Sequence, residues 1–170
     1  MDRMFYFALL ALLAASAFAD VQSLQYSFSP SVGSGSGKTY SLTGAGRITA
    51  VRVWEVYSSV VYGIQFRFGY IWSDLAGTKL NEAKEIELFD GETIVQISGK
   101  YRHYLQSVVF TTSRGRTLSA GQPAGLSFNM YPTHSEAELI FISGRAHGAI
   151  TAIEAHWGVV DSANNSTAWL

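Results

Sequence analysis

A short strand-like segment occurs twice in this chain, once in each half. Ile48-Thr-Ala-Val and Ile150-Thr-Ala-Ile each continue to a tryptophan, Trp54 and Trp157. β-branched and aromatic residues favour strands. A strand that recurs at both ends of an all-β chain predicts a pseudo-symmetric assembly of sheets, closed by its first and last strands. The glycine-bearing turn before the second copy is where such an assembly could hold a ligand.

Val, Ile, Thr, Tyr and Phe are frequent in the rest of the chain, and glycine interrupts them at short intervals. This pattern is typical of many short strands in a sandwich, barrel or prism. Beyond the first residues, only 81–87 could form a helical turn. Asp90-Gly91 and Arg114-Gly115 are typical of hairpin turns. We predict one all-β domain, with strands at 47–54, 60–68, 85–88, 93–100, 104–111, 126–130, 139–143 and 149–157.

Both ends of the chain carry processing signals. Arg3 precedes an apolar run, and Ala17-Phe-Ala19 places small residues at a signal-peptidase site. The run is shorter than a helix that spans a bilayer, so the sequence predicts a signal peptide at 1–19, secretion and no membrane span. We predict an N-terminal segment at 20–30, the folded domain at 31–160 and a loose tail at 161–170. Asn164 and Asn165 in that tail are overlapping glycosylation acceptors.

The composition excludes several classes of function. The chain has no cysteine, which excludes a zinc–thiolate site, a cysteine nucleophile and a redox motif. Its net charge of −1 gives no general attraction to nucleic acid. The four histidines lack metal-ligand spacing, no nucleophile elbow occurs, and the carboxylates are scattered. We therefore predict that the chain is not an enzyme and needs no cofactor or metal.

Three segments could contact a ligand. Residues 32–39 resemble a phosphate-binding loop, but Val32 stands where that loop needs glycine. This segment is either a surface turn or a turn whose bare backbone approaches a polar ligand. Lys100, Arg102 and Tyr104 share one face of a strand, which suits a sulphated or phosphorylated sugar beside a stacking ring; the alternative is a solvated strand end. His147 lies in a glycine turn, where binding side chains collect.

Several ordered blocks of the sequence resemble the jacalin-related lectins, and among them the animal zymogen granule protein 16 type. The resemblance covers Ser31 to Trp157. It implies the β-prism I fold, in which three four-stranded Greek-key sheets surround a pseudo-threefold axis. The blocks begin at Gly33 (GSGSGK), Ile48 (ITAVRV), Tyr62 (YGIQFRFG), Glu92 (ETIVQISGKY), Val108 (VVFTT) and Phe141 (FISGR).

The resemblance also implies a carbohydrate site at one end of the prism, where three segments meet. These are a glycine loop at 33–38, a recognition loop at 100–104 and a binding turn at 146–151, whose backbone amides would meet sugar hydroxyls. The family binds sugars without calcium. The implied site residues are Gly35, Ser36, Gly37, Lys38, Lys100, Tyr101, Arg102, Tyr104, Ala146, His147, Gly148, Ala149 and Thr151.

The chain departs from the family pattern Gly-x-x-x-Asp in the binding turn. His147 replaces the glycine, and Thr151 replaces an aspartate that accepts hydrogen bonds from the sugar. Such a bond contributes ~1.5–3 kcal/mol, so its loss predicts mannose binding weaker by roughly ten- to hundredfold. The expected partners are glycans: mannose-type glycan, sulphated glycosaminoglycan or bacterial wall polysaccharide. The alternative is a secretory-granule matrix or packing protein, with a degenerate sugar site that binds proteoglycan or protein partners.

Overall fold

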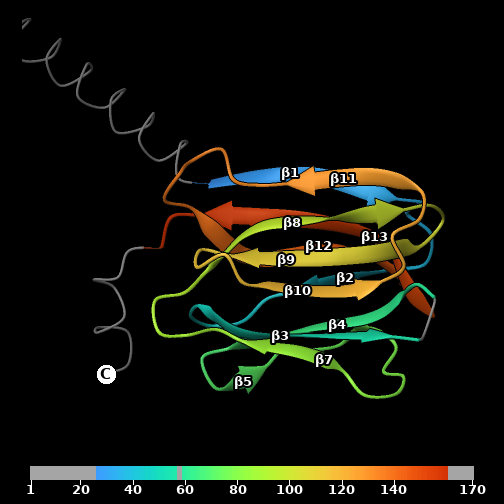
Figure 1. Ribbon diagram of the computed structural model, residues 1–170, viewed down its shortest axis with the longest axis horizontal. Helices are drawn as coiled ribbons and strands as arrows, with labels where there is room; N and C mark the ends of the chain where they lie inside the picture. Colours follow the sequence, from blue (N-terminus) through green and yellow to red (C-terminus); the bar gives the residue numbers. More distant parts are fainter. Residues whose placement is uncertain (1–25, 57–58, 161–170) are drawn as a thin grey trace, which may run out of the picture.

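The computed structural model describes residues 26–56 and 59–160. These residues form thirteen β-strands and no helix, arranged in three antiparallel sheets (Figure 1). Within these residues no helix is long and apolar enough to cross a membrane. The predicted signal peptide, the tail and the acceptors Asn164 and Asn165 lie outside the described residues. Residues 26–30, predicted as part of an N-terminal segment, belong to the first strand.

Each sheet is built around two long inner strands. Sheet A has the order β1 (Tyr26–Gly33), β13 (Ala149–Gly158), β12 (Glu138–His147), β2 (Lys38–Leu42). Sheet B has the order β5 (Ile71–Trp72), β4 (Val61–Phe68), β3 (Ile48–Glu55), β7 (Lys84–Glu87), and β6 (Ala76–Gly77) also pairs with β4. Sheet C has the order β10 (Thr117–Gly121), β9 (Leu105–Thr112), β8 (Ile94–Tyr101), β11 (Leu126–Met130).

The strand orders are those of a Greek key repeated three times. In sheet C, β8, β9 and β10 follow one another as hairpins, and β11 returns to lie beside β8. Sheet B has the same order, with β7 beside β3. Sheet A has the same order, but its strands come from both ends of the described chain. Its adjacent strands β12 and β13 form the first hairpin, β1 lies beside β13, and β2 lies beside β12. The predicted β-prism of three Greek-key sheets is confirmed, and the first strand pairs with the last.

The repeated Ile-Thr-Ala segments are not symmetry equivalents in this fold. The first copy lies in β3, the opening strand of its Greek key, and the second lies in β13, the second strand of its key. Both are inner strands with neighbours on either side, and both copies lead to a buried tryptophan, Trp54 or Trp157. The two copies are alike because both are inner strands of a sheet. The prediction that they mark the pseudo-symmetry was wrong, because they occupy different positions in their Greek keys.

The inner faces of the three sheets meet on the prism axis and form one core. Phe66 of sheet B and Phe110 of sheet C are completely buried and meet edge to face, with ring centroids 5.8 Å apart. Trp157 and Ile142 fill the core from sheet A. Each such side chain contributes about 1.5–3 kcal/mol by leaving water. This packing replaces the disulfides that the cysteine-free chain cannot form.

All eight predicted strands are present, with ends shifted by a few residues, but the sequence patterns missed other elements. Strands β1, β2, β5, β6 and β10 were not among the predicted strands because they are short or largely exposed. The Asp90-Gly91 turn is not a hairpin: it joins β7 of sheet B to β8 of sheet C. The possible helical turn at 81–87 ends in strand β7 instead.

Candidate functional site

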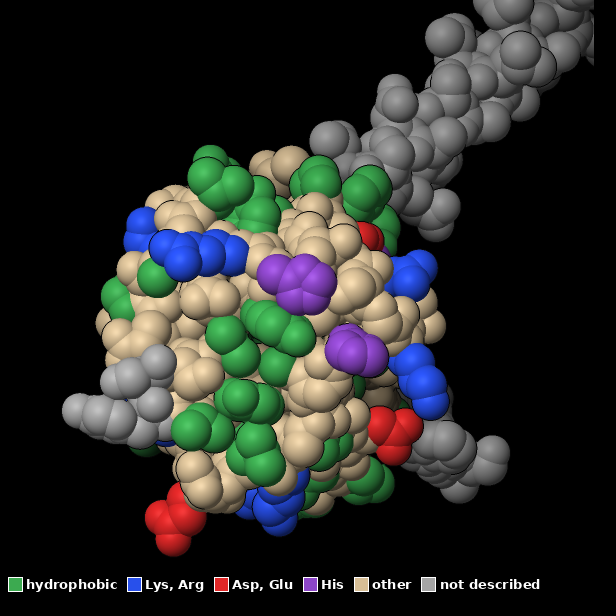
Figure 2. All heavy atoms as spheres, turned by 90° about the vertical axis from the view of Figure 1, so that its right-hand side faces the viewer, with side chains coloured by type: hydrophobic (Ala, Val, Ile, Leu, Met, Phe, Trp, Pro, Cys, Tyr) green, Lys and Arg blue, Asp and Glu red, His purple; other side chains and the backbone are tan. Residues whose placement is uncertain are grey.

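The three segments expected to bind a ligand lie at one end of the prism. The connections that follow β1, β8 and β12 are all at the right-hand end in Figure 1. Side chains from separate sheets meet there, since the Ser36 hydroxyl lies 3.5 Å from Nε2 of His103. Figure 2 looks onto this end: two histidine side chains lie close together, hydrophobic side chains gather beside them, and Lys and Arg side chains lie toward the margin.

The glycine loop, residues 33–38, packs directly on strand β13 and the binding turn. The Ser34 N–H donates to the Thr151 carbonyl at 2.9 Å. A Cβ atom on Gly33 would lie 2.0 Å from that carbonyl oxygen, and one on Gly37 would lie 2.2 Å from the Ala146 oxygen. Both glycines have positive φ, +116° and +90°. Glycine is required at both positions because any side chain would push the loop off the turn.

Thr151 is the extra residue of a β-bulge in the last strand. Arg145 pairs with Ala152 and Ala146 pairs with Ile150, which leaves Thr151 without a partner on β12. Its side chain is fully buried, and its hydroxyl donates to the Ser36 carbonyl at 2.5 Å. Thr151 therefore fastens the glycine loop to the sheet, and in this conformation its hydroxyl is already engaged and shielded from solvent.

The tip of the binding turn is open. His147 and Gly148 are exposed, whereas Ala149 is buried. Gly148 has φ +73° and nothing within 4 Å of its Cβ position, so a ligand can approach its backbone. Arg145, one residue before the turn, donates from Nη1 to the Gly37 carbonyl at 3.1 Å and ties the turn to the glycine loop.

The recognition loop contributes only some of its expected residues to this end. Arg102 and His103 are exposed, and His103 meets Tyr104 edge to face with centroids 4.7 Å apart. Lys100 instead donates to the Ser127 hydroxyl at 2.9 Å, along sheet C. Tyr101 turns inward and packs on the core beside Phe128.

The assembled surface is suited to a polar, uncharged or anionic ligand. It offers the backbone groups of Gly35 and Gly148, where no side chain blocks approach. A shallow groove of about 370 Å³ continues from Gly35 over sheet A, between Thr39, Arg145 and Glu154. Burial raises the pKa of the Tyr40 hydroxyl below this groove, and that hydroxyl donates to the Ala152 carbonyl at 2.9 Å. Among the described residues, no group of three or more His, Asp or Glu side chains could hold a metal.

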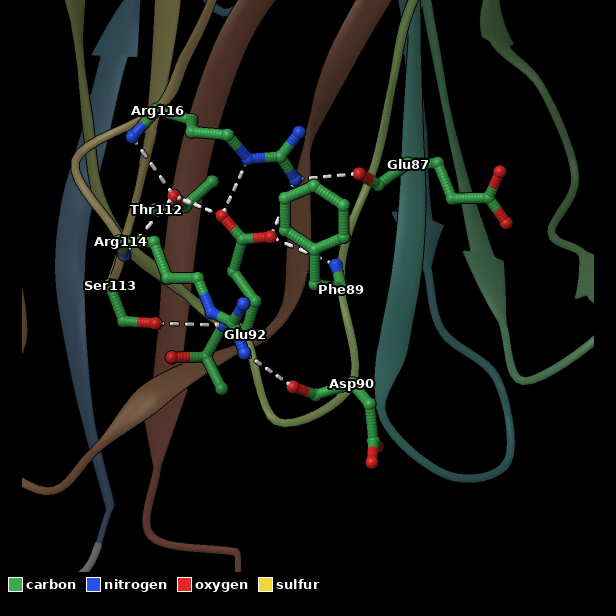
Figure 3. Close-up of polar contacts among 9 residues, drawn as sticks. Glu87, Phe89, Asp90, Glu92, Thr112, Ser113, Arg114 and Arg116 are labelled. Carbon is green, nitrogen blue, oxygen red and sulfur yellow. Dashed lines mark hydrogen bonds and ion pairs between the residues drawn. The ribbon is translucent and has the colours of Figure 1, made fainter.

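The opposite end of the prism holds an ion pair whose carboxylate is buried (Figure 3). The Glu92 carboxylate accepts hydrogen bonds from Arg116 at 2.5 and 2.9 Å, from the Thr112 hydroxyl at 2.5 Å and from the Phe89 N–H at 2.8 Å. These bonds, that of Arg116 above all, lower the pKa of Glu92 to about 2. A groove of about 420 Å³ lies beside them. Because every Glu92 oxygen is satisfied from within the protein, we assign this network to stability.

Two parts of the binding end were missed from the sequence. His103 lies within the predicted recognition loop, but it was not named as a site residue because its spacing indicates no metal or catalytic site; its Nε2 lies 3.5 Å from the Ser36 hydroxyl of the glycine loop. Residues 121–125 were not singled out, although they pack on the recognition loop: a Cβ on Gly125 would lie 2.4 Å from the Tyr101 oxygen. The signal was present, since Gly121 and Gly125 have the same spacing as Gly33 and Gly37.

Known proteins resemble this chain in sequence and fold. Residues 29–156 match the jacalin-like lectin domain. Human zymogen granule membrane protein 16 is 45% identical over 159 residues, which are 91% of this chain and 95% of the human protein. A prostate-specific WGA16 glycoprotein lectin has a TM-score of 0.71 at 30% identity, over 79% of this chain and 100% of that chain. Calystegia sepium agglutinin reaches the same TM-score at 18% identity, over 80% of this chain and 98% of that one, and shows the fold alone.

Proposed function

The chain belongs to the jacalin-like lectin domain family, and on that premise we propose that it is a secreted lectin that binds glycans at the end of the prism formed by the glycine loop and the binding turn. Lectins bind carbohydrates without transforming them, so family membership confirms the prediction that this chain is not an enzyme. The relatives named for zymogen granule membranes are consistent with an association with secretory granules. We propose secretion through such granules.

One observation carries the proposal: the glycine loop is held on the binding turn by backbone contacts that leave the tip free. The Ser34 N–H and the Thr151 hydroxyl close the loop from below. Gly35 and Gly148 remain open above it. Exposed backbone donors and acceptors in a fixed arrangement suit the many hydroxyls of a sugar. Each hydroxyl can exchange a hydrogen bond to water for one to the protein, and the loop loses little conformational entropy because it is already ordered.

We expect simple mannosides to bind weakly at this end. The family's aspartate is absent, and Thr151 in its place directs its hydroxyl to the Ser36 carbonyl. A ligand there would meet no carboxylate from the turn. The exposed cations Lys38, Arg102 and Arg145 favour glycans that carry sulphate or carboxylate, such as sulphated glycosaminoglycan or acidic bacterial wall polysaccharide.

A glycan array tests this function with a matched pair of variants. Gly35→Asn places a side chain over the site, and Gly115→Asn makes the same change in the β9–β10 turn at the opposite end. Both glycines have positive φ and open space at the Cβ position, and asparagine tolerates that backbone region. The array should carry mannosides, sulphated glycosaminoglycans and bacterial wall polysaccharides. We expect Gly35→Asn to reduce glycan binding at least tenfold and Gly115→Asn to retain it.

Two results would refute the proposal. The first is a blank array with folded wild-type protein. The second is equal binding by the two variants, because it would place the ligand elsewhere on the molecule.

The absent carboxylate favours one alternative, a granule matrix or packing protein with a degenerate sugar site that binds proteoglycan or protein partners. Co-sedimentation with proteoglycan separates the two functions. A matrix protein with no working sugar site would sediment with proteoglycan in the Gly35→Asn form as well as in the wild-type form. A lectin acting through its glycine loop would lose that co-sedimentation in the Gly35→Asn variant and keep it in Gly115→Asn.

A further inference from the structure

We infer that two copies of this chain associate through the end of the prism opposite the glycine loop, with Tyr70 of each copy seated in a groove of the other. Such a contact is isologous, so one surface must supply both the projecting side chain and the groove that receives it. The association itself is independent of the proposed function. Its consequence rests on that function, because it concerns where the two glycan sites point.

Hydrophobic side chains that pack on nothing gather at this end. Tyr70 is 98% exposed and Ile71 is 77% exposed, and both lie where β4 turns into β5. Phe89, 54% exposed, lies in the connection from β7 to β8. Both connections are at the left-hand end in Figure 1. Large hydrophobic side chains that gather on a surface mark a contact with a partner.

A groove lies between these two connections. It has a volume of about 420 Å³, and Gly69, the residue before Tyr70, lines it together with Phe89. Two further lining residues, Ile48 and Leu88, are buried and apolar. No side chain closes the groove where three of its glycines have nothing within 4 Å of their Cβ positions: Gly46, Gly69 and Gly91.

The projecting side chain and the groove are therefore neighbours on one surface. Because Tyr70 is almost completely exposed, it does not fill the groove of its own chain. In the groove of a second copy its ring would pack on Ile48 and Leu88, and its hydroxyl would reach the polar margin. This surface meets the requirement of a twofold contact, in which each copy inserts Tyr70 and receives the partner's Tyr70.

The charges around the groove are balanced. Arg47 and Glu138 form an ion pair at 2.7 Å, and Arg116 and Glu92 form another at 2.5 Å. The third arginine and the third carboxylate belong to Arg114 and Asp90. Arg114 donates to the backbone carbonyl of Asp90 at 2.9 Å, whereas the Asp90 carboxylate points away from it in Figure 3.

This balance favours a second copy over a lipid surface. Arg114 and Asp90 are both exposed, and neither forms an ion pair within residues 26–56 and 59–160. In a twofold contact, Arg114 of each copy can pair with the partner's Asp90, so the surface complements its own charge. An anionic lipid surface attracts an excess of cations, and the groove and its margin have none.

The association would make the protein divalent. The glycine loop and the binding turn lie at the other end of the prism. Two copies joined at their opposite ends would direct these glycan sites away from each other. One dimer could then hold two separate glycan chains, and a glycan with many binding units would be bound more tightly than by one copy.

Sedimentation velocity of the protein over a wide range of concentration tests the association. We expect a monomer–dimer equilibrium. Tyr70→Ser should weaken dimer formation at least about tenfold, because each dimer loses the side chain twice. Leu126→Ser is the matched control: it removes a hydrophobic side chain that is 65% exposed, beside residues 121–125 at the glycan end, and should leave the equilibrium unchanged.

Charge reversal tests the pairing between copies. Asp90→Arg and Arg114→Asp should each weaken the dimer, because each brings like charges together across the contact. The double variant should return the dimer to within about threefold of the wild-type dissociation constant, since it restores opposite charges between the copies. A role of these side chains within one chain would not produce this pattern in a dissociation constant.

Several results would overturn the inference. A folded wild-type protein that stays monomeric at every concentration would do so, as would equal effects of Tyr70→Ser and Leu126→Ser or a double variant that fails to recover. A monomer that sediments with phosphatidylcholine–phosphatidylserine vesicles, and loses this in Tyr70→Ser, would assign the end to lipid instead. A dimer together with a blank glycan array would overturn only the proposed function.

Discussion

Replacing Gly33 by alanine tests the backbone contact on which the glycine loop depends. Gly33 has φ +116°, and the new Cβ would lie 2.0 Å from the Thr151 carbonyl oxygen, well below the 3.0 Å that real Cβ contacts respect. The loop would have to move by about an ångström, and the Ser34 hydrogen bond to the same oxygen would stretch or break. Gly35→Ala is the matched control, because Gly35 also has positive φ but nothing within 4 Å of its Cβ position.

The expected cost follows from three contributions. Left-handed backbone costs an alanine roughly 1–2 kcal/mol, and both variants carry this cost. Gly33→Ala adds about 1–3 kcal/mol of overpacking and about 0.5–1.5 kcal/mol for the weakened hydrogen bond. We therefore expect Gly35→Ala to lower the free energy of unfolding by about 1–2 kcal/mol and Gly33→Ala by roughly 2.5–6.5 kcal/mol. The latter lowers Tm by roughly 5–26 °C in a chain of this length.

Urea unfolding followed by tryptophan fluorescence measures this difference, with an unchanged slope showing that the cooperative transition is preserved. Gly121→Ala should cost about as much as Gly33→Ala, since its Cβ position lies 2.1 Å from the Gln106 oxygen. If Gly33→Ala is no more destabilised than Gly35→Ala, the packing of the loop on Thr151 is wrong. If only Gly121→Ala behaves like the control, the packing of residues 121–125 on Gln106 is wrong.

Three further changes test other parts of the structure. Thr151→Val removes the hydroxyl that is hydrogen-bonded to the Ser36 carbonyl. We expect the free energy of unfolding in urea to fall by about 1–2 kcal/mol and glycan binding to weaken. An unchanged stability would show that the buried hydrogen bond is unimportant. Glu92 has its pKa lowered to about 2, chiefly by Arg116, so its stabilising contribution is present above its unfolded-state pKa of 4.5 and is lost as pH falls toward 2. Glu92→Gln should flatten the pH dependence of unfolding in that window; an unaltered dependence contradicts the assignment. Trp157→Phe should lower the free energy of unfolding by about 1–3 kcal/mol, measured by thermal unfolding. The change leaves a cavity and removes the hydrogen bond from the indole N–H to Ser29 of β1. A smaller loss would mean that the core repacks.

Much of the architecture was predictable because it depends on local pattern. Alternating apolar residues such as those of β4 and β9 indicate strands from the sequence alone, since successive side chains face opposite sides of a sheet. The spacing of Gly33, Gly35 and Gly37 indicated a loop with close backbone approach. The resemblance to a known family then gave the number of sheets and the end at which a ligand would bind.

The arrangement of the site depended on distant pairings that no local pattern encodes. A one-residue bulge places Thr151 under the glycine loop and Gln106 at the surface, and the register that creates each bulge is set by contacts between separate strands. The sequence by itself determined which residues form strands and which glycines are needed, because strand propensity and backbone freedom are properties of single residues and their neighbours. Only the tertiary structure decided that Lys100 turns toward Ser127, that His103 reaches Ser36 and that residues 121–125 pack on the recognition loop, because these relations arise when three sheets close around one axis.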